Sequence, residues 1–216
     1  MDVNQLVQTV AIYALPVLFA ITLHEAAHGY VARHFGDMTA HAQGRISLNP
    51  LRHIDWLGTI VVPLVILFLS GYKFLFGWAK PVPVNYSALR KPRRHMAWVA
   101  AAGPGANLAM ALAWALLLKL AVLLPASSVS LPLGRMAEAG VLVNLVFMCL
   151  NLLPILPLDG GRIVASLLPS RAAWQYSRLE PWGLPVLVLL LVTNVLNFLL
   201  EPLVGASGAL IRAIVF

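Results

Sequence analysis

The chain has 216 residues, of which 60% are hydrophobic and only 11% are charged, and its mean hydropathy is +0.84. A soluble domain carries roughly a quarter charged residues, so this composition excludes a water-soluble globular protein. The net charge of +7 could suggest a nucleic-acid-binding protein, but lysine and arginine also gather in the cytoplasmic loops of membrane proteins, and we predict no nucleic acid partner. The single cysteine, Cys149, excludes an internal disulfide and a cysteine-rich metal cluster.

Apolar runs of the length that crosses a bilayer core, about 20 residues, recur along the chain. They predict an all-α polytopic membrane protein that forms one membrane-embedded domain over residues 1–216. The predicted membrane segments are residues 4–34, 56–72, 96–124, 138–158 and 182–201. Residues 202–216 are predicted either to lie on the membrane or to return into it.

The first segment contains no Asp, Glu, Lys, Arg or His from Val3 to Leu23 and then continues into the sequence HEAAH. Positions i and i+4 share one face of a helix, so His24 and His28 are predicted to point at a common centre, with Glu25 beside them. Two imidazoles and a neighbouring carboxylate are typical of a zinc hydrolase, in which the metal lowers the pKa of a water and the carboxylate accepts its proton. The alternative is that the histidines are interfacial and that Glu25 extends to the membrane surface.

The polar loop that follows contains further residues of the metal-binding types, which lack the paired spacing of ligands, among them His34, His41, His53 and Asp55. We interpret them as interfacial residues. Any of them could instead hydrogen-bond to an imidazole that binds metal.

Two short stretches near the predicted site have the alternation of β-strands: GRISLNP, residues 44–50, and KPVPVNY, residues 80–86. Because its prolines cannot donate hydrogen bonds, the second stretch is predicted to be an edge strand. A substrate segment unwound from its helix can add to such an edge, so Val82 and Val84 are candidate substrate-binding residues. The alternative is that both stretches are plain connecting loops.

The third membrane segment is preceded by RKPRRH, residues 90–95, which we predict to contact anionic lipid headgroups. The segment itself contains AAGPGAN, residues 101–107. Its small residues favour close helix packing, and contact between Asn107 and the site is the less favoured alternative.

A zinc hydrolase usually has three protein ligands and one open position. The best candidate for the third ligand is Asp159 in NLLPILPLDGG, because it follows directly on the apolar run that ends at Leu158. Pro154 and Pro157 interrupt the helix before it, and the two glycines after it allow close approach of the backbone. The alternative is an ordinary Asp-Gly-Gly turn.

His28 and Asp159 can meet only if the segments that carry them end on the same side of the membrane. Strict alternation of the apolar runs forbids this, whereas a re-entrant segment at residues 56–72, turning near Pro63 and Gly71, allows it. With that topology twelve Lys and Arg residues share the side of the site and three lie opposite, against nine and six for strict alternation. The positive-inside rule then predicts a site near the cytoplasmic face.

Together, HEAAH, AAGPGAN and NLLPILPLDGG resemble the site-2 proteases, the zinc intramembrane proteases of peptidase family M50. GRISLNPLRHIDWLGT and GWAKPVPVN resemble the short bacterial and archaeal branch without PDZ or CBS domains. The resemblance implies a three-helix core in a prokaryotic cell membrane, a transmembrane protein or peptide as substrate, and one Zn²⁺ per chain. It also implies that His24, His28 and Asp159 bind the zinc, that Glu25 is the catalytic base, and that Asn151 binds substrate or the developing oxyanion.

We therefore expect an intramembrane zinc metalloendopeptidase that cleaves within or near transmembrane segments. A membrane metal-ion transporter is the main alternative, but transport requires ligands spread through the bilayer, whereas these residues gather at one depth. A non-catalytic zinc-binding membrane protein is the other alternative, and it would have no use for Glu25.

Overall fold

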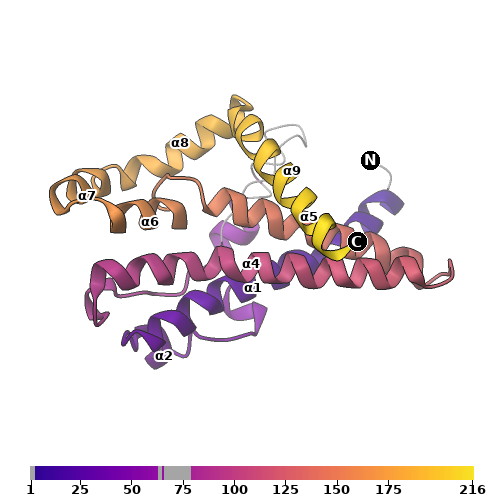
Figure 1. The fold of residues 1–216 in the computed structure, drawn as a ribbon, viewed down its shortest axis with the longest axis horizontal. Helices are drawn as coiled ribbons and strands as arrows, with labels where there is room; N and C mark the ends of the chain where they lie inside the picture. The colour runs from indigo at the N-terminus through magenta and orange to yellow at the C-terminus, as the bar shows by residue number, and fades with distance from the viewer. Residues whose placement is uncertain (1–2, 63–64, 66–78) are drawn as a thin grey trace.

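The computed structural model describes residues 3–62, 65 and 79–216, and this part of the chain is almost entirely helical (Figure 1). Four of its helices are long and apolar enough to cross a membrane, which confirms the prediction of an all-α polytopic membrane protein. These helices are α1 (Val3–His34), α4 (Pro92–Leu123), α5 (Ser130–Asn151) and α9 (Val195–Val215).

The helices α1, α4 and α5 pack against one another as a three-helix core (Figure 1). Small side chains at the contacts let the helices approach closely: Ala20 on α1, Ala111 on α4 and Ala137 on α5 are completely buried. A Cβ atom on Gly140 of α5 would lie 2.3 Å from the Trp114 ring of α4. The contact between these two helices therefore requires a glycine at that position.

The last predicted membrane segment, residues 182–201, is divided in the structure. Helix α8 (Glu180–Val192) ends at Thr193, and α9 begins after Asn194, which has a left-handed backbone with φ of 61°. Asparagine adopts this conformation more readily than most residues. Most of residues 202–216 therefore belong to α9, which packs against α4 and α5.

The chain leaves α1 and enters α4 at the same end of the molecule. The carbonyl oxygen of Phe35 accepts a hydrogen bond from Arg90 N at 3.0 Å, and the carboxylate of Asp37 accepts one from Asn85 N at 2.7 Å. Between these points lie the short helices α2 (Thr39–Ala42), η1 (Pro50–Arg52), η2 (Trp56–Val61) and η3 (Tyr86–Ala88). The π-helix η2 begins the predicted re-entrant segment, most of which lies outside the described residues.

The prediction of β-strands at residues 44–50 and 80–86 was wrong, since the described part of the chain contains no strand. The reason is that side chains take the backbone groups that a strand ladder would need. The guanidinium of Arg45 donates to the carbonyl oxygens of Lys80 and Pro81 at 3.0 and 3.2 Å. Both stretches are therefore loops, held beside α1 by side-chain contacts.

Helix α5 ends at Asn151, earlier than the apolar run predicted to continue to residue 158. A turn that contains Pro154 follows, and α6 (Asp159–Leu167) then begins directly at the aspartate and packs against α4. A carboxylate is favourable in the first turn of a helix because the backbone N–H groups there are unpaired. The helix α7 (Ser170–Ser177) connects α6 to α8.

Candidate metal centre

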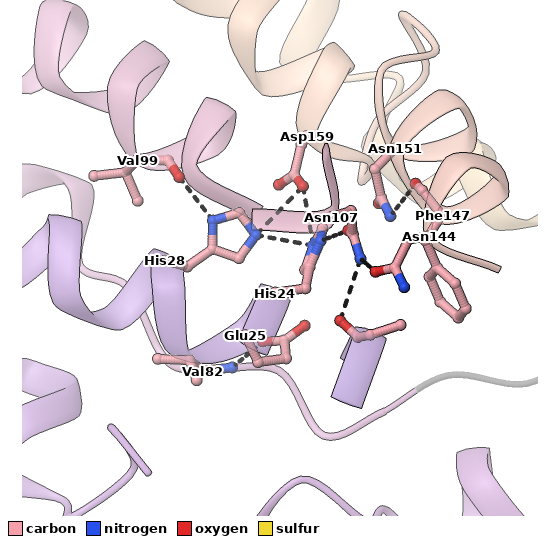
Figure 2. A network of polar contacts seen from close by, with 11 residues as sticks. His24, Glu25, His28, Val82, Val99, Asn107, Asn144, Phe147, Asn151 and Asp159 are labelled. Carbon is pink, nitrogen blue, oxygen red and sulfur yellow. Dashed lines mark hydrogen bonds and ion pairs between the residues drawn. The ribbon is translucent and has the colours of Figure 1, made fainter. Parts of the chain in front are cut away.

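The HEAAH sequence lies in the C-terminal half of α1, facing α4 and the start of α6 (Figure 2). His24 and His28 are buried, with exposed fractions of 7% and 9%, and their Nε2 atoms are 3.1 Å apart. Glu25 is half-buried beside them. The i, i+4 spacing thus brings both imidazoles to one point, as predicted.

Asp159 reaches the same point from the first residue of α6. Its Oδ2 atom lies 3.2 Å from Nε2 of His24 and 3.3 Å from Nε2 of His28. The structure therefore brings together three residues from distant parts of the sequence: two from the first helix and one that lies more than 130 residues later. Among the described residues they are also the only group of three or more His, Cys, Asp or Glu with the spacing of a metal site.

The outer nitrogen of each imidazole is held by an oxygen of α4. Nδ1 of His24 is 2.6 Å from Oδ1 of Asn107, and Nδ1 of His28 is 2.7 Å from the carbonyl oxygen of Val99. Amide and carbonyl oxygens can only accept, so each Nδ1 must carry the proton. In the neutral rings both Nε2 atoms then present lone pairs to the centre.

The carboxylate of Asp159 adds a third lone pair, because its Oδ2 atom is buried and finds no hydrogen-bond donor among the described residues. Three electron-rich atoms within 3.3 Å of one another repel unless something positive lies between them. The arrangement is therefore suited to holding a cation.

The spacing of the three atoms fits a zinc ion. A tetrahedral zinc with bonds of about 2.0–2.1 Å holds its ligand atoms about 3.3 Å from one another, close to the observed 3.1, 3.2 and 3.3 Å. Two imidazoles and one carboxylate are also a ligand set of catalytic zinc, which keeps its fourth position open.

Two glycines make this convergence sterically feasible. A Cβ atom on Gly103 of α4 would lie 2.4 Å from Nε2 of His28, and one on Gly160 of α6 would lie 2.2 Å from the carbonyl oxygen of Leu152. The first glycine opens the space in front of the imidazoles, and the second lets α6 pack against the turn that precedes it. Gly103 of AAGPGAN thus lets α4 approach α1 closely, as helix packing requires, and it does so at the two imidazoles.

The loop at residues 79–85 holds the carboxylate of Glu25. Its Oε2 atom accepts a hydrogen bond of 2.7 Å from the backbone N–H of Val82 (Figure 2). The buried side chain of Val82 lies against α1 at Gly29, together with Ile46. The loop therefore fixes the orientation of the carboxylate next to the two histidines.

Asn151 lies at the end of α5, and its amide donates to the carbonyl oxygen of Phe147 at 3.0 Å (Figure 2). Two residues of the first polar loop contact the backbone near them. Nε2 of His53 donates to the carbonyl oxygen of Ser47 at 2.8 Å, and the carboxylate of Asp55 accepts from Gly58 N at 2.6 Å.

Two asparagines lie behind the imidazoles. Asn107 contacts His24, which was the less favoured of the two sequence interpretations, and Asn144 of α5, which the sequence analysis did not consider, contacts Asn107 (Figure 2). The available signal was that each interrupts an otherwise apolar run. A polar side chain buried in such a run needs a hydrogen-bond partner.

Comparison with known proteins identifies relatives that cover most of the chain. The family model described as Peptidase family M50 matches residues 121–193. The chain is 37% identical over 199 residues to the Bacillus subtilis protein named "Putative zinc metalloprotease YwhC", covering 89% of this chain and 85% of that protein. It is also 32% identical over 182 residues to the Mycolicibacterium smegmatis protein named "Putative zinc metalloprotease Rip2", covering 83% of this chain and 66% of that protein. No solved structure matches the chain.

Proposed function

Since this chain belongs to peptidase family M50, the site-2 protease family, and is a zinc metalloprotease, we propose that it cleaves peptide bonds within or near the transmembrane segments of other membrane proteins. His24, His28 and Asp159 hold the zinc ion, and Glu25 is the catalytic base. The observation that supports this most strongly is the convergence of three lone pairs, each within 3.3 Å of the others, beside the Glu25 carboxylate.

Zinc in such a site acts as a Lewis acid and makes a water nucleophilic near neutral pH. The protein must then supply a base. Glu25 directly follows His24 in the sequence, and its carboxylate lies beside the two imidazoles. The Val82 N–H holds Oε2, so Oε1 is the oxygen that accepts the proton. A carboxylate fixed in this way loses little freedom on reaching the reactive geometry.

Asn151 is the proposed substrate or oxyanion ligand. Its side chain is partly exposed at the end of α5, close to the turn that leads to Asp159. The amide now donates to its own helix at Phe147, so a rotation of the side chain would be required to bring it to a substrate carbonyl.

The contacts of the loop at residues 80–86 limit which of its backbone groups could bind substrate. The N–H of Val82 already donates to Glu25, so in this arrangement it is not available to a substrate. Val84 remains the candidate for main-chain contact with substrate, and Val82 is better assigned to holding the base.

A transmembrane substrate is supported by the position of the site. The two histidines lie on a helix long enough to span a membrane, so the peptide bond must approach from within or beside the bilayer. The excess of Lys and Arg on the side of the site supports a location near the cytoplasmic face of a prokaryotic cell membrane. We propose that residues 1–216 act as one domain in this role.

The test compares Glu25→Gln with wild type in detergent, for bound zinc and for cleavage of a model transmembrane peptide. Loss of a general base typically lowers the rate by about 10²–10⁴-fold, while the three ligands keep the zinc. Glu138→Gln is the matched control, because Glu138 is exposed on α5. Cleavage by Glu25→Gln at the wild-type rate would refute the assignment of the base, and a zinc-loaded wild type that cleaves no transmembrane peptide would refute the substrate class.

A further inference from the structure

Two asparagines form a buried polar chain behind the metal centre. Asn107 of α4 and Asn144 of α5 both have an exposed fraction of 0%. The chain runs from His24 through Asn107 to Asn144, with distances of 2.6 and 3.0 Å (Figure 2). It ends at the carbonyl oxygen of Gly140, 2.8 Å from the amide of Asn144. It connects α1, α4 and α5 at one level of the core.

Backbone carbonyls fix the direction of every hydrogen bond in this chain. Because the Gly140 carbonyl can only accept, the NH₂ group of Asn144 must face it and its Oδ1 must face Asn107. The NH₂ group of Asn107 then donates to Asn144 and to the carbonyl oxygen of Ala20, at 3.0 and 3.3 Å. The only remaining atom, Oδ1 of Asn107, is turned toward Nδ1 of His24.

We propose that Asn144 is a positioning residue of the metal centre, acting on His24 through Asn107. Asn144 accepts the shorter of the two hydrogen bonds that the Asn107 NH₂ group donates, and the Ala20 carbonyl accepts the longer one. Together they keep the amide of Asn107 from turning around, so Nδ1 of His24 carries the proton and Nε2 is free for the metal. This inference rests on the proposed function of His24 as a zinc ligand. It assigns a role to a side chain that reaches the ligand His24 through Asn107.

The tautomer of His28 has a separate support. Its Nδ1 is held by the Val99 carbonyl oxygen, a backbone atom that no side-chain substitution removes. His28 therefore serves as an internal reference: loss of Asn144 should affect the ring of His24 and leave the ring of His28 unchanged.

The test uses Asn144→Leu, which removes the amide but keeps a side chain of similar size. Substitution of groups that orient metal-binding histidines typically costs about 10–100-fold in metal affinity, and we expect about tenfold for zinc in competition with a chelator. In the zinc-free protein labelled with ¹⁵N-histidine, NMR should show His24 shifting from the Nδ1–H toward the Nε2–H tautomer. Asn144→Asp should restore zinc binding, because a neutral carboxylic acid can accept from Asn107 and donate to Gly140.

A second comparison separates positioning from general destabilisation. Val143→Ala removes packing from the neighbouring buried position of α5 without touching the polar chain, so it should lower stability but not zinc affinity. If Asn144 acts through Asn107, the double variant Asn107→Leu/Asn144→Leu should bind zinc no more weakly than Asn107→Leu alone. Where Asn144→Leu does not fold, Asn144→Ala carries the same expectation.

The inference is overturned if the Asn144 variant binds zinc as tightly as wild type, if the His24 tautomer is unchanged, or if the two substitutions have additive effects. These failures are distinct from failure of the proposed function. If the proposed function were wrong, the wild-type protein itself would bind no zinc or cleave no peptide.

Discussion

Gly103 of α4 and His28 of α1 are so close that a Cβ atom on the glycine would lie 2.4 Å from Nε2 of the imidazole. Real Cβ atoms do not approach a nitrogen so closely, so any side chain at this position must push the imidazole out of the centre. Gly103→Ala is therefore expected to abolish zinc binding while the helices remain folded, measured as zinc per chain and by circular dichroism. A Gly103→Ala variant with full zinc content would show that the centre lies elsewhere.

The control for this prediction lies two residues further on the same helix. A Cβ atom on Gly105 would meet no atom within 4 Å, and alanine favours the helix over glycine by about 1 kcal/mol. Gly105→Ala should keep its zinc and be as stable as wild type or slightly more so. Loss of zinc in both variants would indicate a general effect on α4.

The N–H of Val82 predicts a specific effect of proline at that position. Val82→Pro removes the donor that holds Glu25, so we expect cleavage to fall by about 10²-fold, the typical effect of misplacing a reacting group, with zinc content unchanged. Val82→Ala keeps the N–H and should be affected much less. Equal activity of Val82→Pro and wild type would exclude a role for this contact in catalysis.

Gly160 provides a test of how Asp159 is positioned. A Cβ atom there would lie 2.2 Å from the carbonyl oxygen of Leu152, a backbone atom that cannot move without shifting the turn. Gly160→Ala should lower the free energy of unfolding by on the order of 1–3 kcal/mol, as overpacking does, and should weaken zinc binding. Gly205→Ala on α9, where a Cβ atom meets nothing within 4 Å, should do neither.

The orientation in the membrane can be tested with single cysteines. His41 lies on the short helix α2 at the site's end of the molecule and Ser128 lies between α4 and α5 at the other end, and both are exposed. The native Cys149 is buried. In intact cells a membrane-impermeant maleimide should label Ser128→Cys but not His41→Cys, and the reverse pattern would place the site on the outer face.

The three residues that meet at the centre could be predicted from the sequence because local rules determine them. The spacing of His24 and His28 places both on one helix face whatever surrounds them. Asp159 was identifiable because an acid at the end of an apolar run must have a partner or a function. Both arguments depend on the chain alone and needed no knowledge of the packing.

The features that could not be predicted depend on contacts between distant parts of the chain. Alternation predicted a strand at residues 80–86, but nothing in that stretch shows that Arg45 and Glu25 take its backbone groups. Likewise, the sequence contains Asn107 and Asn144 in two apolar runs, but only packing of the helices shows that they are 3.0 Å apart. The break between α8 and α9 at Asn194 was likewise not predicted.

The most direct test of the central claim is X-ray absorption at the zinc K-edge on the purified, zinc-loaded protein. We predict one zinc per chain with only nitrogen and oxygen ligands at about 2.0–2.2 Å and the outer-shell scattering of two imidazoles, a signature that Asp159→Ala alters. A sulfur ligand at about 2.3 Å, which in this chain could come only from Cys149 or a methionine, or a spectrum unchanged in Asp159→Ala, would contradict the account.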